Sequence, residues 1–234
     1  MRANAAPASR IGGFTLIELI VAISILALLA ILSWRGLDGM SRAQSQTQSR
    51  ADEVLTLQAG LSQWGADLDA VVQVPQVSAV DWDGRALRMT RRSTVSPYDG
   101  LLVVAWTRRN MEGGGKWLRW QSPPLRSRGE LQEAWARAAQ WAQNPGEEER
   151  RREVVITGLD EWQIFYFRSD AWTNPLSSDG ATTAPAAAPA AAVAAGVSNI
   201  PDGVRVVLTL PQGQALSGVI TRDWVRPTAG GGKS

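Results

Sequence analysis

An unbroken apolar segment near the N-terminus constrains this chain more than any other feature. Residues 14–34 contain only four polar side chains: Thr15, Glu18, Ser24 and Ser33. As a helix these residues extend about 31 Å, which matches the ~30 Å hydrocarbon thickness of a bilayer. Arg2 and Arg10 precede the segment without any acidic residue. The length predicts a single membrane-spanning helix. The charge bias predicts its orientation, with a cytoplasmic N-terminus and the rest of the chain on the other side.

Three explanations compete for this segment. A secretory signal would have an apolar run of roughly 7–15 residues and then a small-x-small cleavage site, which residues 33–36 do not supply. An ordinary membrane anchor explains the length but not Glu18, because a carboxylate in hydrocarbon costs several kcal/mol unless it is paired or protonated. Glu18 lies one turn into the segment, so it could instead reach the lipid headgroups. The third explanation is an apolar helix in which the Glu18 carboxylate has a function of its own.

The composition excludes many kinds of catalytic and metal site. The 234 residues include no Cys and no His, which rules out disulfides, thiolate or imidazole metal ligands, Ser-His-Asp triads and imidazole acid–base chemistry. A membrane-anchored hydrolase could use carboxylates alone, but no paired acids stand out at neighbouring strand ends. Residues 81–84 open like a calcium loop, yet Arg85 and Arg92 stand where an EF-hand needs ligands. We therefore predict no enzyme activity, no cofactor and no metal site.

Residues 35–74 are predicted to form a stalk followed by an amphipathic helix. Gly36 and Gly39 each cost about 1 kcal/mol in a helix relative to Ala, and they suggest a helix joint where the chain leaves the membrane. Residues 41–50 are almost wholly polar. Apolar residues then recur with helical spacing at Val54, Leu57, Leu61, Trp64, Leu68 and Val71. We expect this face to pack on the rest of the domain.

Residues 75–227 are predicted to form an α+β head. Strand patterns occur at 86–92, 101–107, 116–121, 153–157, 162–168, 204–210 and 217–225, and a short amphipathic helix at 129–144. Tight turns between these strands favour an antiparallel sheet. The charge block at 147–152 is expected in a solvated loop, with docking to a charged partner as the alternative. The Ala/Pro-rich stretch at 180–196 is expected to be a mobile surface loop, and 228–234 a disordered tail.

Tryptophan is used unusually often, at 11 positions. Trp106, Trp162 and Trp224 fall within strand patterns and are expected in the core. Trp117 and Trp120 point to opposite faces of one strand, which makes one of them a candidate for exposure. An exposed Trp would favour a protein interface.

Residues 13–18, Gly-Phe-Thr-Leu-Ile-Glu, resemble the processing motif of type IV prepilins and type II secretion pseudopilins. The resemblance implies cleavage between Gly13 and Phe14 by the prepilin peptidase, and N-methylation of Phe14. It implies an assembly role for Glu18, whose carboxylate could pair with the new α-amino group of a neighbouring subunit. Cleavage removes Arg2 and Arg10 and leaves 22 basic and 22 acidic residues, so no nucleic-acid partner is expected.

Several segments narrow the resemblance to the J-type minor pseudopilins. These are residues 33–40 and 67–69, the strand pair at 158–172, and residues 200–204 with the strand that follows. The family implies a pilin-like α+β fold, in which a long N-terminal helix, half membrane-spanning and half amphipathic, packs on an antiparallel head. Departures from the family pattern are the helix at 129–144 and the Ala/Pro insertion.

The J-type resemblance implies a role in the tip complex that primes a short periplasmic filament for export of folded proteins. The implied partners are the I-type and K-type minor pseudopilins, the major pseudopilin and the inner-membrane assembly platform. The implied location is the bacterial inner membrane, with the head in the periplasm and the subunit membrane-inserted before assembly. The alternative within the same superfamily is a minor pilin of a type IV pilus, serving adhesion or DNA uptake.

Overall fold

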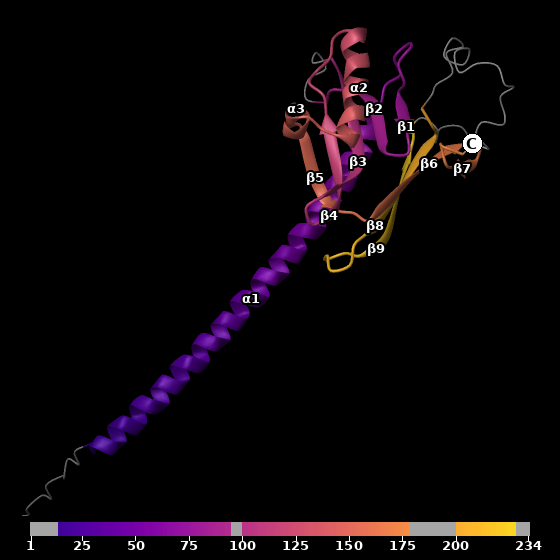
Figure 1. The fold of residues 1–234 in the computed structure, drawn as a ribbon. Coiled ribbons are helices and arrows are strands. Elements are labelled where there is room, and N and C mark those ends of the chain that lie inside the picture. The colour runs from indigo at the N-terminus through magenta and orange to yellow at the C-terminus, as the bar shows by residue number, and fades with distance from the viewer. Residues whose placement is uncertain (1–13, 95–99, 178–199, 228–234) are drawn as a thin grey trace, which may run out of the picture. The chain divides into compact units, whose positions relative to one another are not determined.

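The computed structural model describes residues 14–94, 100–177 and 200–227 (Figure 1). The predicted leader at 1–13, including Gly13, lies outside these described residues, as do the Ala/Pro-rich loop at 180–196 and the tail at 228–234. The chain divides into two compact units, the first ending at Ser49 and the second beginning at Arg50. Helix α1 (Leu16–Asp69) includes residues of both units.

A five-stranded antiparallel sheet forms the first half of the head. Its strands are ordered as in the sequence: β1 (Val80–Trp82), β2 (Ala86–Arg92), β3 (Leu101–Met111), β4 (Gly114–Gln121) and β5 (Glu153–Gly158). Leu87 pairs with Trp106 and Met89 with Val104 across β2 and β3. Because side chains alternate along a strand, these four residues share one face of the sheet.

A four-stranded antiparallel sheet forms the second half. Its order is β7-β6-β8-β9, with β6 (Glu161–Arg168), β7 (Ala171–Thr173), β8 (Gly203–Leu210) and β9 (Gly218–Val225). Ser169 and Asp170 join β6 to β7 with φ of 51° and 62°. Both residues lie in the left-handed region, as a two-residue type I′ hairpin turn requires.

The larger core cluster lies among the head part of α1 and one face of each sheet. From α1 it takes Leu57, Trp64 and Leu68, which come from the apolar stripe expected at 54–71. From the two sheets it takes Val80, Trp82, Leu87, Met89, Val104, Trp106, Trp117, Ile164, Tyr166, Val204, Val206, Leu208, Leu210 and Trp224. The stripe thus packs as expected, and the fold class is confirmed: a long N-terminal helix followed by antiparallel sheets in an α+β chain.

A second core cluster covers the opposite face of the five-stranded sheet. Helix α2 (Arg128–Gln143) packs there through Leu131, Ala138 and Trp141, and the Trp141 ring stacks on Trp120 at 6.2 Å between centroids. The helix begins with a capping box: Glu130 N–H donates to Ser127 Oγ at 3.2 Å, while the Glu130 carboxylate accepts from Ser127 N–H at 3.1 Å. Backbone N–H groups of Arg126 and Ser127 hold the pKa of Glu130 below its usual range.

The expectation that Trp117 or Trp120 of β4 is exposed is wrong, because a helix covers each face of the five-stranded sheet. Trp117 and Trp120 do point to opposite faces, but both are buried, because α1 covers one face and α2 the other. The charge block at 147–152 is likewise not a loop: residues 147–151 form the short helix α3 (Glu147–Arg151), although its residues are solvated as expected. Strands β1 and β7, three residues each, were not among the strand patterns located in the sequence, although the family-like segment at 158–172 extends into β7.

Tyr166 on β6 carries a testable stability effect. Its side chain is buried, and within the described part of the chain its hydroxyl has no hydrogen-bond partner. Burial raises the pKa of Tyr166 above its usual range, with the Asp81 charge adding to the effect. Tyr166→Phe removes the unsatisfied hydroxyl and is therefore expected to stabilise the fold by about 1 kcal/mol at neutral pH.

The same substitution should change the alkaline limb of the stability curve. In the unfolded chain Tyr166 ionises near pH 10, whereas the folded chain holds the proton. The contribution of this residue to the free energy of unfolding is therefore constant below pH 10 and is lost as the pH rises above it. Urea unfolding at about pH 8 and about pH 11 should show a smaller stability loss for Tyr166→Phe than for the parent chain. Equal losses would mean that the phenol ionises freely in the folded state.

Candidate functional site on helix α1

The N-terminal turn of α1 is capped by the residue that precedes it. Glu18 N–H donates to Thr15 Oγ1 at 3.4 Å, and the Thr15 hydroxyl donates to Glu18 Oε2, also at 3.4 Å. Thr15 thus takes the N-cap position, and Glu18 lies in the first turn, where a negative charge is favourable to the helix dipole. Within the described residues Thr15 is the one hydrogen-bond partner of this carboxylate, which therefore keeps free acceptor sites.

The apolar side chains that follow are exposed along the whole segment. Phe14 is 79% exposed and Trp34 is 75% exposed, and every large apolar residue between them is more than half exposed. Among the described residues, α1 is the one helix long and apolar enough to cross a membrane, and none of that stretch is buried. So much apolar surface is unfavourable in water, and the segment needs lipid or other apolar helices around it.

The two glycines of the expected joint, Gly36 and Gly39, lie within the continuous helix α1. No atom beyond the local helix backbone lies within 4 Å of a Cβ added at either position, so packing does not require glycine there. Asp38 and Arg42 bridge this stretch with a 2.7 Å ion pair on the surface. A bend at these glycines stays a prediction.

The C-terminal turn of α1 holds a buried carboxylate in the head. Asp67 is fully buried and accepts from Arg119 Nε at 2.7 Å, Arg119 Nη2 at 2.8 Å and Trp106 Nε1 at 2.9 Å. Arg91 Nη1 also donates to it, and Gln63 Nε2 donates at 2.9 Å. Two guanidinium groups and two neutral donors thus compensate one charge that has lost all contact with water.

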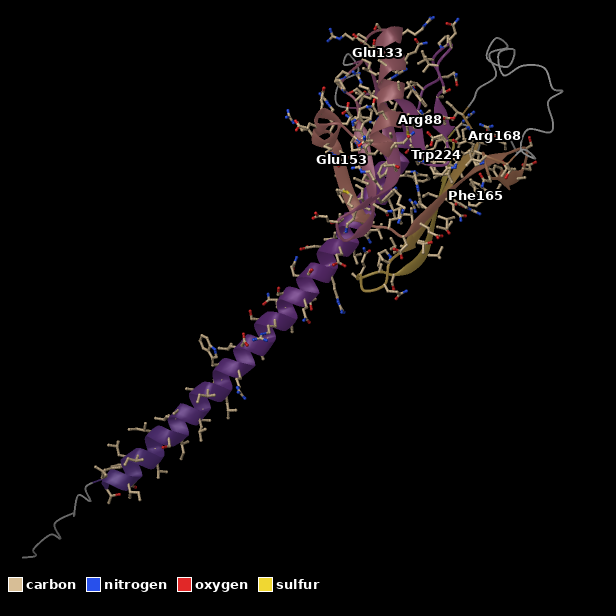
Figure 2. The ribbon with its side chains drawn as sticks, viewed as in Figure 1. Arg88, Glu133, Glu153, Phe165, Arg168 and Trp224 are labelled. Atoms are coloured by element: carbon tan, nitrogen blue, oxygen red, sulfur yellow. The ribbon has the colours of Figure 1, made fainter. Side chains whose placement is uncertain are left out.

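A second carboxylate two residues later reaches the other sheet. Trp224 Nε1 on β9, labelled in Figure 2, donates to Asp69 Oδ1 at 2.7 Å. Leu68, between the two acids, is buried in the larger core cluster. Asp67 therefore binds residues of β2, β3 and β4, and Asp69 binds β9. We call Asp67, Asp69 and their five donors (Gln63, Arg91, Trp106, Arg119 and Trp224) the helix-end clamp.

Sequence reasoning marked residues 67–69 as a family-like segment but did not find this clamp. A usable signal was present: Asp67 lies beside Leu68 and three residues after Trp64, within the stripe that was expected to be buried. An acid within a buried helical face requires partners. Its partners on the strands are 24, 39 and 52 residues away in sequence, so spacing could not reveal them.

The calcium-like turn at 81–84 is occupied by internal partners. Arg88 Nη2 lies 2.5 Å from Asp81 Oδ2 and 3.1 Å from Asp83 Oδ2. Asp83 Oδ1 also accepts from the backbone N–H of Ala86 at 2.8 Å. Both carboxylates thus close a turn. Nowhere in the described ranges do three or more acids gather in a group that could hold a metal ion.

Comparisons with known proteins bear chiefly on the anchor. The prokaryotic N-terminal methylation motif matches residues 8–34, a range that contains Gly13, Phe14 and Glu18. No curated protein matches the chain. A chain of the crystal structure of the GspK-GspI-GspJ complex from the enterotoxigenic Escherichia coli type 2 secretion system is 19% identical, with a TM-score of 0.42. That alignment covers 74% of this chain and 96% of the solved one. A likeness at this TM-score is too weak to carry an argument, whereas the motif and the exposed apolar helix together indicate a membrane-anchored protein.

Proposed function

We propose that this chain is a minor pseudopilin of a type II secretion system, of the J type, acting in the tip complex that primes filament assembly. The observation that carries the proposal is that the methylation motif coincides with the apolar N-terminal stretch of α1, none of which is buried. Glu18 adds support, because it is an acid inside that segment whose carboxylate keeps acceptor sites for a further partner. A plain anchor has no use for such a group.

In this proposal the prepilin peptidase cuts between Gly13 and Phe14 and the new N-terminus is methylated. The head lies in the periplasm, the N-terminus starts in the cytoplasm, and the subunit waits in the inner membrane. The I-type and K-type minor pseudopilins, the major pseudopilin and the assembly platform are its partners. The role is mechanical: α1 leaves lipid and packs against other helices, while the head docks beside other heads.

The first test is chemical. Intact-mass and N-terminal analysis of the membrane form should show a chain that starts at N-methylated Phe14. A membrane form that begins at Met1, with residues 1–13 still attached, would contradict the proposal and leave a tethered domain.

The second test separates secretion from piliation. Deletion of the gene should abolish export of folded proteins and leave pili normal, and the full-length chain should restore export. Lost pili with normal export would instead establish the minor-pilin alternative.

A further inference from the structure

The helix-end clamp holds α1 through directional contacts, whereas the rest of the α1 packing is non-directional. The apolar stripe of α1 meets the two sheets through Leu57, Trp64 and Leu68. Apolar contacts of this kind are non-directional, so they resist separation of the surfaces more than sliding along the helix axis. The hydrogen bonds of Asp67 and Asp69 have fixed directions and lengths, and a shift of the helix by a fraction of a turn would break them.

The clamp is also costly for a feature that serves stability alone. A buried ion pair can often be replaced by apolar side chains without loss of stability. Here one fully buried carboxylate draws in two arginines and a tryptophan from three strands. Its neighbour, two residues on, reaches the other sheet through Trp224. The last turn of α1 is thereby tied separately to each sheet.

We infer that the clamp transmits force along α1 to both sheets of the head, with Asp67 coupling the helix to the five-stranded sheet and Asp69 to the four-stranded sheet. The biological purpose rests on the proposed function, since a filament subunit is pulled out of the membrane by its helix while its head must follow. The coupling itself is a property of the isolated chain. Asp67 and Asp69 act in it as positioning residues that hold the helix in register.

The head contains a matched control for this idea. Glu153 on β5, labelled in Figure 2, accepts from Arg109 Nη2 at 2.7 Å and from Trp141 Nε1 at 2.7 Å. This cluster has the same chemistry as the Asp67 group: a mostly buried carboxylate with a guanidinium and an indole N–H. It joins α2 to the five-stranded sheet, and among the described residues its hydrogen bonds link Arg109, Trp141 and Glu153 to one another and not to α1. Glu153→Gln should therefore weaken the head without uncoupling the helix.

Single-molecule pulling on the full chain in detergent tests the inference. The chain has no Cys, so paired cysteines give unique handles. Leu55→Cys, at an exposed position of α1, supplies the first handle. Met111→Cys at the end of β3 or Val219→Cys on β9, both exposed, supplies the second. Pulling between positions 55 and 111 loads α1 against the five-stranded sheet, and pulling between positions 55 and 219 loads it against the four-stranded sheet.

Each variant of the helix-end clamp should raise the rate of helix detachment mainly in one of the two pulling geometries. Asp67→Asn is expected to raise the rate of helix detachment at constant force about a hundredfold against β3, and much less against β9. Trp224→Phe, which removes the donor to Asp69 but keeps a ring, should show the reverse preference. Glu153→Gln should leave both detachment rates within a few-fold of the parent, although it lowers stability in urea.

Equal acceleration in both geometries, or acceleration by Glu153→Gln as large as by Asp67→Asn, would overturn the inference and leave only a stabilising ion cluster. If Asp67→Asn does not fold, Arg119→Gln, which removes two of the donor bonds to Asp67, is measured in its place. A geometry-specific result in a chain whose deletion leaves secretion intact would keep the coupling and reject the proposed function.

Discussion

Replacing Glu18 by Ala is expected to reduce export of folded proteins by about a hundredfold, while cleavage after Gly13 stays normal. In the proposed function, cleavage leaves a charge at Phe14 that Glu18 neutralises. An unpaired ion at the centre of a bilayer costs about 2.5–3.5 kcal/mol, and each 1.36 kcal/mol is a factor of ten. The Thr15 hydroxyl, which lies 3.4 Å from the Glu18 carboxylate, cannot neutralise this charge in its place because the hydroxyl is itself neutral. Export and leader cleavage are measured in the same cells by activity of exported enzymes and by the subunit's mass.

Two further variants at position 18 separate charge from shape. Glu18→Gln keeps the size and loses the charge, so it should behave like Glu18→Ala. Glu18→Asp keeps the charge on a side chain one methylene shorter and should retain much of the export. Normal export by Glu18→Gln would show that the side chain serves only to accept from the Thr15 hydroxyl, a role that the amide can share.

Replacing Gly60 by Val is expected to destabilise the head by about 2–3 kcal/mol. Gly60 lies in the buried face of α1, where an added Cβ would come within 2.3 Å of Ile156 Cγ2 and 3.5 Å of Trp117 Cζ3. The helix therefore approaches β5 more closely than any side chain at position 60 allows. Urea unfolding of the full chain in detergent, followed by circular dichroism, measures the loss.

Gly65, five residues later in the same helix, is the control. No atom beyond the local helix backbone lies within 4 Å of a Cβ added there, so Gly65→Ala should stabilise the chain by up to about 1 kcal/mol through helix propensity. The two glycines thus predict opposite signs for similar changes. A stabilising substitution at Gly60 would mean that α1 and β5 lie farther apart than the structure has them.

Local patterns were sufficient for most of the fold. The stripe from Val54 to Leu68 predicted the buried face of α1, because one helical face repeats every three or four residues whatever it packs against. Strand β2 was located by its alternation, with Leu87 and Met89 on one face, and strands β3 and β8 by their short apolar runs. What escaped prediction depends on partners distant in sequence: the division of the strands into two sheets, the burial of both Trp117 and Trp120, and the pairing of Asp67 with Arg91 and Arg119.

The short strands escaped for a local reason. Three residues carry too little alternation to be told from a loop, and the Ser169-Asp170 turn lacks the glycine that usually marks a type I′ hairpin. The anchor shows the opposite case: its length, basic flank and single acid are contained within some thirty consecutive residues, so no tertiary contact was needed to identify it. The proposed cleavage after Gly13 and the proposed role of Glu18 are predictions from that motif.

The distribution of indole rings has a spectroscopic consequence. Of the 11 tryptophans, Trp34 alone belongs to the first unit, and it is exposed. The other ten belong to the second unit, where Trp64, Trp106, Trp117, Trp120 and Trp141 are almost completely shielded from solvent. Subtracting the emission of a Trp34→Phe chain would therefore isolate one fluorophore at the end of the anchor. Its wavelength would distinguish lipid, detergent and a packed helix bundle without any attached dye.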